Sequence, residues 1–116
     1  MSAPSSDQAA IRQTLRALKA AGVTPTYAEY GDGDGEDVTG ATEQATIDAI
    51  MAVDDCYLIV DLPERFVGLE DHPGHQPERT TSHIRFVMGN DPEEVICDHG
   101  VSLSPVLDPL TEGWWE

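Results

Sequence analysis

The segment between Ala20 and Glu64 carries eleven carboxylates and neither lysine nor arginine. Acidic side chains that lack cationic neighbours repel one another and destabilise a compact state. The charge is therefore either tolerated by a stable core or used in the protein's function. The eleven acidic residues are Glu29, Asp32, Asp34, Glu36, Asp37, Glu43, Asp48, Asp54, Asp55, Asp61 and Glu64.

The length and the apolar content predict a folded chain. The sequence has 116 residues, of which 40% are hydrophobic, and this size suits one domain with its own core. Apolar residues are grouped in runs such as 56–60, which a disordered acidic tail would lack. We expect one compact domain over residues 1–116, with residues 1–6 disordered.

Hydrophobic spacing predicts three helices. Ile11, Leu15 and Leu18 recur at intervals of four and three residues, which indicates the apolar stripe of a helix. A second helix is expected to begin after Thr42 and to end at residue 54 or 55. Ser104 followed by proline is typical of the start of a helix, and here Pro109 interrupts or kinks it before residue 113. The expected helices cover residues 7–21, 43–55 and 104–112.

Short β-branched and apolar runs predict strands between these helices. Pro25 indicates that the first strand begins late or lies at the edge of a sheet. The run 56–61 is typical of a central strand, and residues 62–82 form a long loop. The fold class is therefore α+β, with a mostly antiparallel sheet of three to five strands, two main helices and a short C-terminal helix. The expected strands cover residues 23–30, 37–39, 56–61, 83–88 and 94–101.

The charge is distributed unevenly and argues against some partners. Residues 1–19 carry a charge of +2, from Arg12, Arg16 and Lys19 against Asp7. The remaining residues carry −18, which gives the net charge of −16. Nucleic acids and anionic membranes would repel such a chain. Neither a secretory signal nor a membrane-spanning run is recognised, so we expect a cytoplasmic protein with reduced cysteines.

One acidic window resembles a calcium-binding loop in spacing only. Asp32, Asp34, Glu36 and Glu43 occupy positions one, three, five and twelve of a twelve-residue window. Position six is Asp37, where the sharp turn of such a loop needs glycine. The preceding residues are also poor helix formers, so we interpret the window as a solvated acidic turn.

A zinc site remains an open alternative, and an enzyme is not expected. His72, His75, Cys97 and His99 are residue types that bind zinc, although their spacing is not diagnostic. The sequence has neither a phosphate-binding glycine loop nor a serine elbow, and no cysteine is paired with histidine in a recognised motif. We therefore expect no catalytic residues, metal or cofactor.

The acidic segment itself is the strongest functional feature. Duplex DNA presents one negative charge per about 1.7 Å of its axis, so a protein that occupies a DNA-binding channel must offer carboxylates densely. Carboxylates within about 8 Å of one another act as a single field. We expect the partner-binding residues to be Glu29, Asp32, Asp34, Glu36, Asp37, Glu43, Asp48, Asp54, Asp55 and the aromatic residue Tyr30.

In size, acidity and scarcity of lysine the whole chain resembles the DNA-mimic inhibitors made by phages and mobile elements, namely anti-CRISPR and anti-restriction proteins. The resemblance implies a stoichiometric inhibitor in the host cytoplasm, bound to a basic nucleic-acid-binding protein of a defence complex. It implies no individual functional residue, because it rests on no motif. The oligomeric state stays open between monomer and homodimer, and Tyr27, Tyr30, Trp114 and Trp115 are candidate apolar anchors.

Two other interpretations fit the same composition. Adaptation to a salt-rich cytosol also favours abundant Asp and Glu with little lysine, whatever the protein does. Alternatively, the chain is an acidic interaction module, such as an antitoxin or adaptor, whose basic partner does not bind DNA. A solvation role spreads carboxylates over every face of a protein, whereas mimicry concentrates them on one, so their placement in the fold discriminates between these readings.

Overall fold

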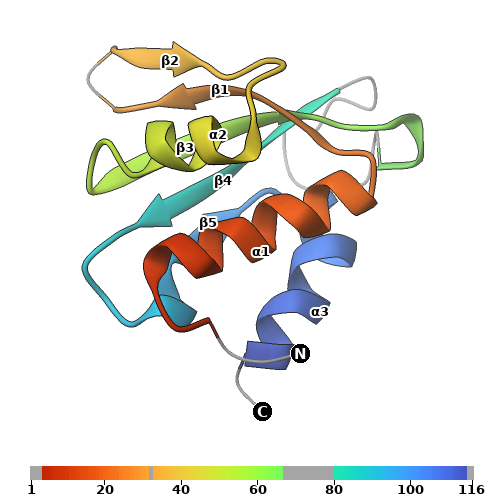
Figure 1. Cartoon of the computed structure of the whole chain (residues 1–116). Helices are drawn as coiled ribbons and strands as arrows, with labels where there is room; N and C mark the ends of the chain where they lie inside the picture. Colours follow the sequence, from red (N-terminus) through yellow and green to blue (C-terminus); the bar gives the residue numbers. More distant parts are fainter. Residues whose placement is uncertain (1–3, 32, 67–79, 115–116) are drawn as a thin grey trace.

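A five-stranded antiparallel sheet in the order β2-β1-β3-β4-β5 forms the centre of the computed structural model (Figure 1). The structure describes residues 4–31, 33–66 and 80–114. Its strands are β1 (Thr24–Glu29), β2 (Gly35–Asp37), β3 (Asp55–Asp61), β4 (Thr81–Val87) and β5 (Ile96–His99). Its helices are α1 (Asp7–Ala20), α2 (Glu43–Ile50) and α3 (Ser104–Trp114), with three short 3₁₀ turns, η1 (Glu64–Phe66), η2 (Pro92–Glu94) and η3 (Val101–Leu103).

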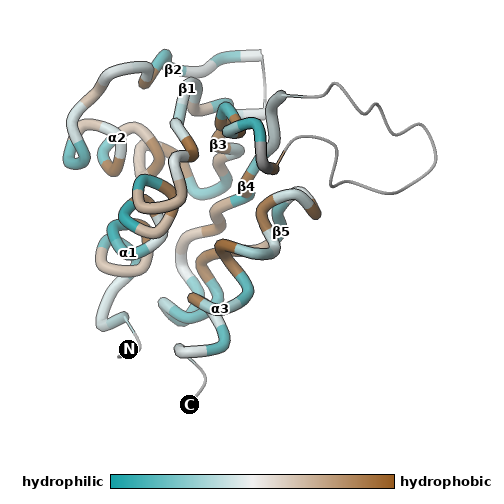
Figure 2. Tube along the Cα trace, turned by 90° about the vertical axis from the view of Figure 1, so that its right-hand side faces the viewer, coloured by the Kyte–Doolittle hydropathy of each residue, from teal (hydrophilic) through white to brown (hydrophobic). Residues whose placement is uncertain are grey.

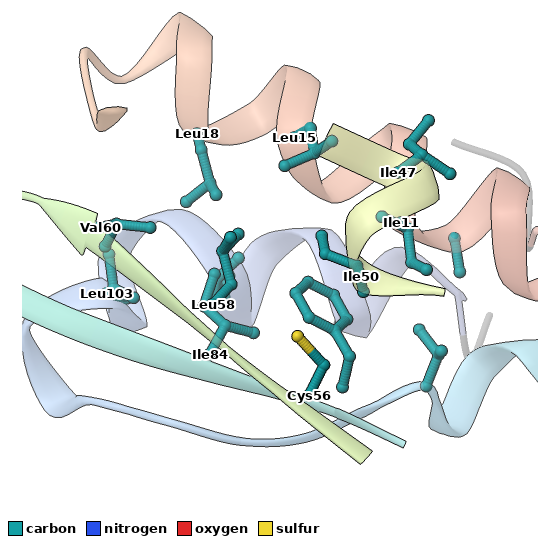
Figure 3. Close-up of a cluster of buried hydrophobic side chains, with 14 of the residues drawn as sticks. Ile11, Leu15, Leu18, Ile47, Ile50, Cys56, Leu58, Val60, Ile84 and Leu103 are labelled. Carbon is teal, nitrogen blue, oxygen red and sulfur yellow. The ribbon is translucent and has the colours of Figure 1, made fainter. Parts of the chain in front are cut away.

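The helices cover one face of the sheet, as Figure 2 shows for α1 and α2. Alternate residues of a strand point to opposite faces, and Cys56, Leu58 and Val60 of β3 are fully buried beneath these helices. Leu15 and Leu18 of α1 lie over the same region, together with the apolar residues of α2 (Figure 3). This packing places the hydrophobic core on the helical side of the sheet.

The opposite face of the sheet is not covered by any element that the structure describes. It carries the other set of alternate residues, among them Tyr57 and Ile59 of β3 and His83 and Arg85 of β4, all of which are partly exposed. Among the described residues, no helix lies on this side of the strands (Figure 2). We call this surface the open face.

The expected fold class is confirmed: the protein is α+β, with an antiparallel sheet, two main helices and a C-terminal helix. The central position of β3 is also as predicted, and β4 and β5 pair as an antiparallel hairpin. The expectation of disorder over residues 1–6 does not hold from residue 4 onward. Pro4 is buried, and the Ser6 hydroxyl accepts a hydrogen bond from the Ala9 N–H at 3.1 Å, which caps α1.

β1 as a whole lies between β2 and β3, but β2 pairs only with Tyr27, Ala28 and Glu29. Among the described strands, Pro25 itself therefore has β3 alone beside it, which is the edge environment expected for a proline. The pairing of β1 with β3 shifts register between Pro25 and Tyr27. Such an irregularity accommodates the N–H that proline lacks. β2 begins at Gly35, two residues earlier than expected, because the acidic turn between the two strands is shorter than the glycine content suggested.

The two later helices also differ from expectation. α2 ends at Ile50 and is followed by turns at residues 51–54, so the acidic residues there lie outside the helix. α3 continues through Pro109 to Trp114. Leu107, Leu110 and Trp114 are buried on one side of α3, and this burial offsets the hydrogen bond that proline removes, which costs about 3 kcal/mol in a helix.

The expected long loop over residues 62–82 is only partly described. It begins with η1 and ends where β4 starts at Thr81, while residues 67–79 lie outside the described part of the chain. Across the described residues, no helix is long and apolar enough to cross a membrane.

Candidate functional site

Carboxylates gather at the end of the sheet where β1 stops and β3 starts. Glu29 pairs across the ladders with Gly35 of β2 and with Tyr57 of β3. The turn between β1 and β2 and the loop between α2 and β3 therefore lie at the same end, on the left in Figure 1. We call this region the acidic end and define it by Glu29, Asp34, Glu36, Asp54 and Asp55.

Tyr30 fixes the acidic end to the helical layer. Its hydroxyl donates a hydrogen bond to the Ala49 carbonyl near the end of α2, at 2.7 Å. Burial raises the pKa of this phenol, and the Glu36 carboxylate adds to the rise. Tyr30 thereby links the end of β1 to α2. Its expected contact with a partner stays a prediction.

Glu43 is not an isolated carboxylate. It receives hydrogen bonds from Arg12 at 3.0 Å and from Arg16 at 3.0 and 3.2 Å, both on α1. The hydrogen bond from Arg16 is the main reason why the pKa of Glu43 is lowered. The cations of the basic N-terminal segment therefore neutralise the first turn of α2, and Glu43 has little left to offer a partner.

Asp55 is likewise paired, on the open face. Arg85 binds its carboxylate through two nitrogens, Nε at 3.0 Å and Nη2 at 2.6 Å. This contact lowers the pKa of Asp55 and raises that of Arg85. The same guanidinium lies 5.6 Å from the centre of the Tyr57 ring, a cation–π distance.

Several acidic residues of this half of the molecule have no cationic neighbour among the residues that the structure describes. Within the described ranges, no cation contacts Glu29, Glu36, Asp48 or Asp54. Asp48 accepts a hydrogen bond from Gln44, which leaves its charge in place. Together with Asp37, these residues are the part of the expected partner-binding set to which no described cation is paired.

The remaining acidic residues of the β1–β2 hairpin hold its turns through hydrogen bonds or lie outside the described residues. Asp37 accepts the Thr39 backbone N–H at 2.8 Å, which lowers the pKa of its carboxyl and closes the turn after β2. The Asp34 carbonyl accepts the Tyr30 N–H and so closes the hairpin between β1 and β2. Asp32 lies outside the described residues.

The acidic residues do not share one face of the sheet. Asp37 pairs with Tyr27 across the hairpin, and Glu29 lies two residues after Tyr27 in β1. Both therefore belong to the open face, as Tyr27 does. Glu36 pairs with the buried Ala28 and thus belongs to the helical side, where α2 carries Asp48. The acidic surface therefore wraps around the β2 edge.

A second acidic region lies at the other edge of the sheet. Glu93, Glu94 and Asp98 line a hollow of about 460 Å³ together with Cys97, His99 and Thr111. Asp108 and Glu112 are exposed on the neighbouring α3. The carboxylates are thus distributed over two sides of the molecule, and the outer side of α1 carries the cations Arg12, Arg16 and Lys19.

The metal sites considered from the sequence are not assembled in the described part of the chain, where no group of three or more His, Cys, Asp and Glu side chains is arranged to hold an ion. His99 is instead held by Gly100 and Asp108: its Nδ1 lies 2.8 Å from the Gly100 oxygen and its Nε2 lies 3.4 Å from the Asp108 carboxylate. Cys97 is a free, exposed thiol. His72 and His75 lie outside the described residues.

The remaining candidate anchors have structural roles. Trp114 is 3% exposed, and its Nε1 donates to Gln13 of α1 at 2.8 Å, so it closes the core between α1 and α3. Tyr27 is 36% exposed and its ring packs directly on Gly35, where a Cβ would overlap the ring. Trp115 lies beyond the described residues.

The cluster of Tyr57, His83 and Arg85 on the open face was not singled out from the sequence. The Tyr57 and His83 rings lie 6.0 Å apart, with Arg85 stacked against the same tyrosine. The alternation of His83 and Arg85 with buried Ile84 and Phe86 was a usable signal for this cluster, because it assigns both polar residues to one face.

Comparison with known proteins adds no family. No family model, curated protein or solved structure matches this chain. The function is therefore argued from the surface itself.

Proposed function

We propose that this chain is a stoichiometric inhibitor that offers its carboxylates to the cationic nucleic-acid-binding site of another protein, of the kind found in host defence complexes. The observation that carries the proposal is that three described arginines are paired with only two of the carboxylates. Arg12 and Arg16 bind Glu43 and Arg85 binds Asp55, while Glu29, Glu36, Asp48 and Asp54 keep no cation beside them in the described structure.

Charge complementarity explains how such an inhibitor would act. A site that grips phosphates presents Lys and Arg, and carboxylates from the acidic end and α2 would pair with the same groups. Long-range attraction would speed the encounter, and the contact would exclude the nucleic acid. The Tyr30 hydroxyl donates a hydrogen bond to Ala49, and the Tyr27 ring packs on Gly35, so the hairpin is held in place. These carboxylates would therefore bind with little loss of backbone freedom.

The second acidic region favours a second candidate. Glu93, Glu94 and Glu112 lie far along the sheet from the β2 edge, and a mimic that uses only one surface has no need of them. Carboxylates on several sides are what adaptation to high salt would produce. This reading predicts loss of structure at low ionic strength, because repulsion between carboxylates is then unscreened.

A charge-matched pair of variants tests the proposal. The first variant replaces three acids around the β2 edge, Glu36→Gln, Asp48→Asn and Asp54→Asn. The second replaces three at the other edge, Glu93→Gln, Glu94→Gln and Glu112→Gln. Both remove three negative charges, so a general effect of net charge would appear equally in the two proteins.

The assay is capture of nucleic-acid-binding proteins from a bacterial lysate, followed by elution with duplex DNA. We expect the wild type and the second variant to retain proteins that duplex DNA releases, and the first variant to lose them. Equal loss in both variants would contradict a localised surface. Capture that DNA does not reverse would instead indicate an antitoxin or adaptor role.

Unfolding at low ionic strength separates salt adaptation from inhibition. A domain adapted to high salt should lose its circular dichroism signal as salt is removed, whereas an inhibitor from an ordinary host should stay folded and bind more tightly. The measurement is a thermal melt at a series of salt concentrations.

A further inference from the structure

The open face contains a hollow of about 280 Å³ beside the acidic end. Strand register places Glu29 directly opposite Tyr57, and Ile59 directly opposite His83. An aliphatic side chain, two rings and a carboxylate thus meet around one cavity on the open face. Its lining residues are Glu29, Tyr57, Ile59, Thr81, Ser82 and His83.

The same face already shows how a guanidinium is held. Arg85 makes two hydrogen bonds to Asp55 and lies over the Tyr57 ring at 5.6 Å. A carboxylate beside an aromatic ring is therefore sufficient, in this molecule, to fix an arginine side chain. Tyr57 stands between β4, which supplies Arg85, and β1, which supplies a second carboxylate at Glu29.

Glu29 differs from Asp55 in that no described arginine binds it. In the ranges that the structure describes, no cation contacts this carboxylate. Its negative potential reaches the sheet, since burial, Asp55 and Glu29, in that order, raise the pKa of the Cys56 thiol. The lining of the hollow thus combines the aliphatic side chain of Ile59 with a carboxylate, Glu29, that no described cation contacts.

We infer that this hollow binds an arginine side chain of the protein partner. The inference rests on the proposed function, because it names the anchor by which a basic partner would be held. The aliphatic stem of the arginine packs on Ile59, its guanidinium donates to Glu29, and its planar group lies against Tyr57. Lysine fits less well, because its ammonium cannot form the two-nitrogen contact or stack on a ring.

Binding of two peptides of equal charge tests the site on the complete chain. The probes are nona-arginine and nona-lysine peptides, titrated into isotopically labelled protein and followed by nuclear magnetic resonance. We expect nona-arginine to bind about tenfold more tightly, since it alone can add stacking to the ionic contact. The largest shifts should fall on Tyr57, Ile59 and His83.

Two variants with the same charge provide the control. Glu29→Gln should reduce the preference for arginine over lysine to about twofold or less, because the guanidinium loses its carboxylate. Glu93→Gln removes one charge at the other edge of the sheet and should weaken both peptides equally, leaving the tenfold preference unchanged. Tyr57→Leu keeps the bulk of the side chain and should also lower the preference, and circular dichroism checks that each variant is folded.

Several results would overturn the inference. Equal affinity for the two peptides, or shifts confined to α2 or η2, would show that the hollow does not read a guanidinium. Concentration-dependent shifts of Tyr57 and His83 without peptide would show that a second copy of this chain occupies the hollow. Failure of the proposed function would be observed differently. Duplex DNA would not release the captured proteins, while the preference for the arginine peptide would persist.

Discussion

The two faces of the sheet use alternate residues of the same strands and yet differ in environment. On the helical side, Leu58 and Ile84 are fully buried beneath the helices (Figure 3), and Phe86 is fully buried as well. On the open face, their neighbours Tyr57 and Arg85 are partly exposed and form a ring and ion-pair cluster. The comparison teaches that one short segment supplies stability and surface chemistry independently, because successive side chains point in opposite directions.

Replacement of a large residue on each face should show the largest contrast. Phe86→Ala leaves a cavity in the core and should lower the free energy of unfolding by about 3–5 kcal/mol. Tyr57→Ala removes a side chain from a surface where water can fill the space, and should cost about 1 kcal/mol. Urea unfolding followed by circular dichroism measures both, and losses of equal size would contradict the distinction between the faces.

The reactivity of the two cysteines compares the buried side of the sheet with an exposed position. Burial raises the pKa of the Cys56 thiol to about 11, and its side chain faces the helices, whereas Cys97 on β5 is exposed. Only the thiolate reacts with disulfide reagents, so at pH 8 Cys56 should react on the order of 100-fold more slowly than Cys97.

The number of thiols titrated by a coloured disulfide reagent checks this expectation. One equivalent should appear rapidly in buffer, the second should follow much more slowly or appear at once in denaturant, and Cys97→Ser should abolish the rapid phase. Two rapid equivalents in the native protein would show that the core face is accessible.

A substitution in the hairpin of β1 and β2 tests whether packing on the open face also stabilises the fold. Gly35→Ala places a methyl group where the Tyr27 ring lies, so the ring must move away from the strand. We expect a loss of about 1 kcal/mol, the scale of a cross-strand pair. A double-mutant cycle with Tyr27→Leu isolates the contact: the double variant should lose less than the sum of the singles, and additive losses would argue against the packing.

The ion pair on the open face should have the smallest effect. Because Arg85 holds the pKa of Asp55 below its usual 3.8, the pair stabilises the fold above that pH and loses its effect as the pH falls through the lowered value. The contribution should be small, because both side chains are partly exposed and water screens the pair. Unfolding of wild type and Asp55→Asn should therefore differ slightly at pH 7 and converge as the pH falls through the lowered pKa of Asp55. A difference that grew at low pH would have the wrong sign for this pair.

Much of the fold was predictable because its signals are local. The spacing of Ile11, Leu15 and Leu18 and the cap at Ser6 define α1 without reference to the rest of the chain. The continuation of α3 through Pro109 was not predictable, because it depends on the burial of Leu107 and Trp114 against other elements.

The site was predictable only in part, for a related reason. The acidic residues could be found in the sequence, but their neutralisation could not, because Arg12 and Arg16 are remote in sequence from Glu43, and Arg85 is remote from Asp55. Local propensity carries no information about contacts that the tertiary fold creates. The expected lack of cationic neighbours therefore held for Glu29, Glu36, Asp48 and Asp54, within the described residues, and failed for Glu43 and Asp55.

The outer strand β5 has a consequence for the protein at high concentration. The Gly100 N–H bonds to the His83 carbonyl, so the adjacent His99 N–H points away from β4, and there the Asp98 carboxylate accepts it at 2.9 Å. At the opposite border, β2 is three residues long and carries Glu36 and Asp37. Neither border offers a neutral template for strand addition, so concentrated solutions of this protein should resist the edge-to-edge stacking that seeds fibrils.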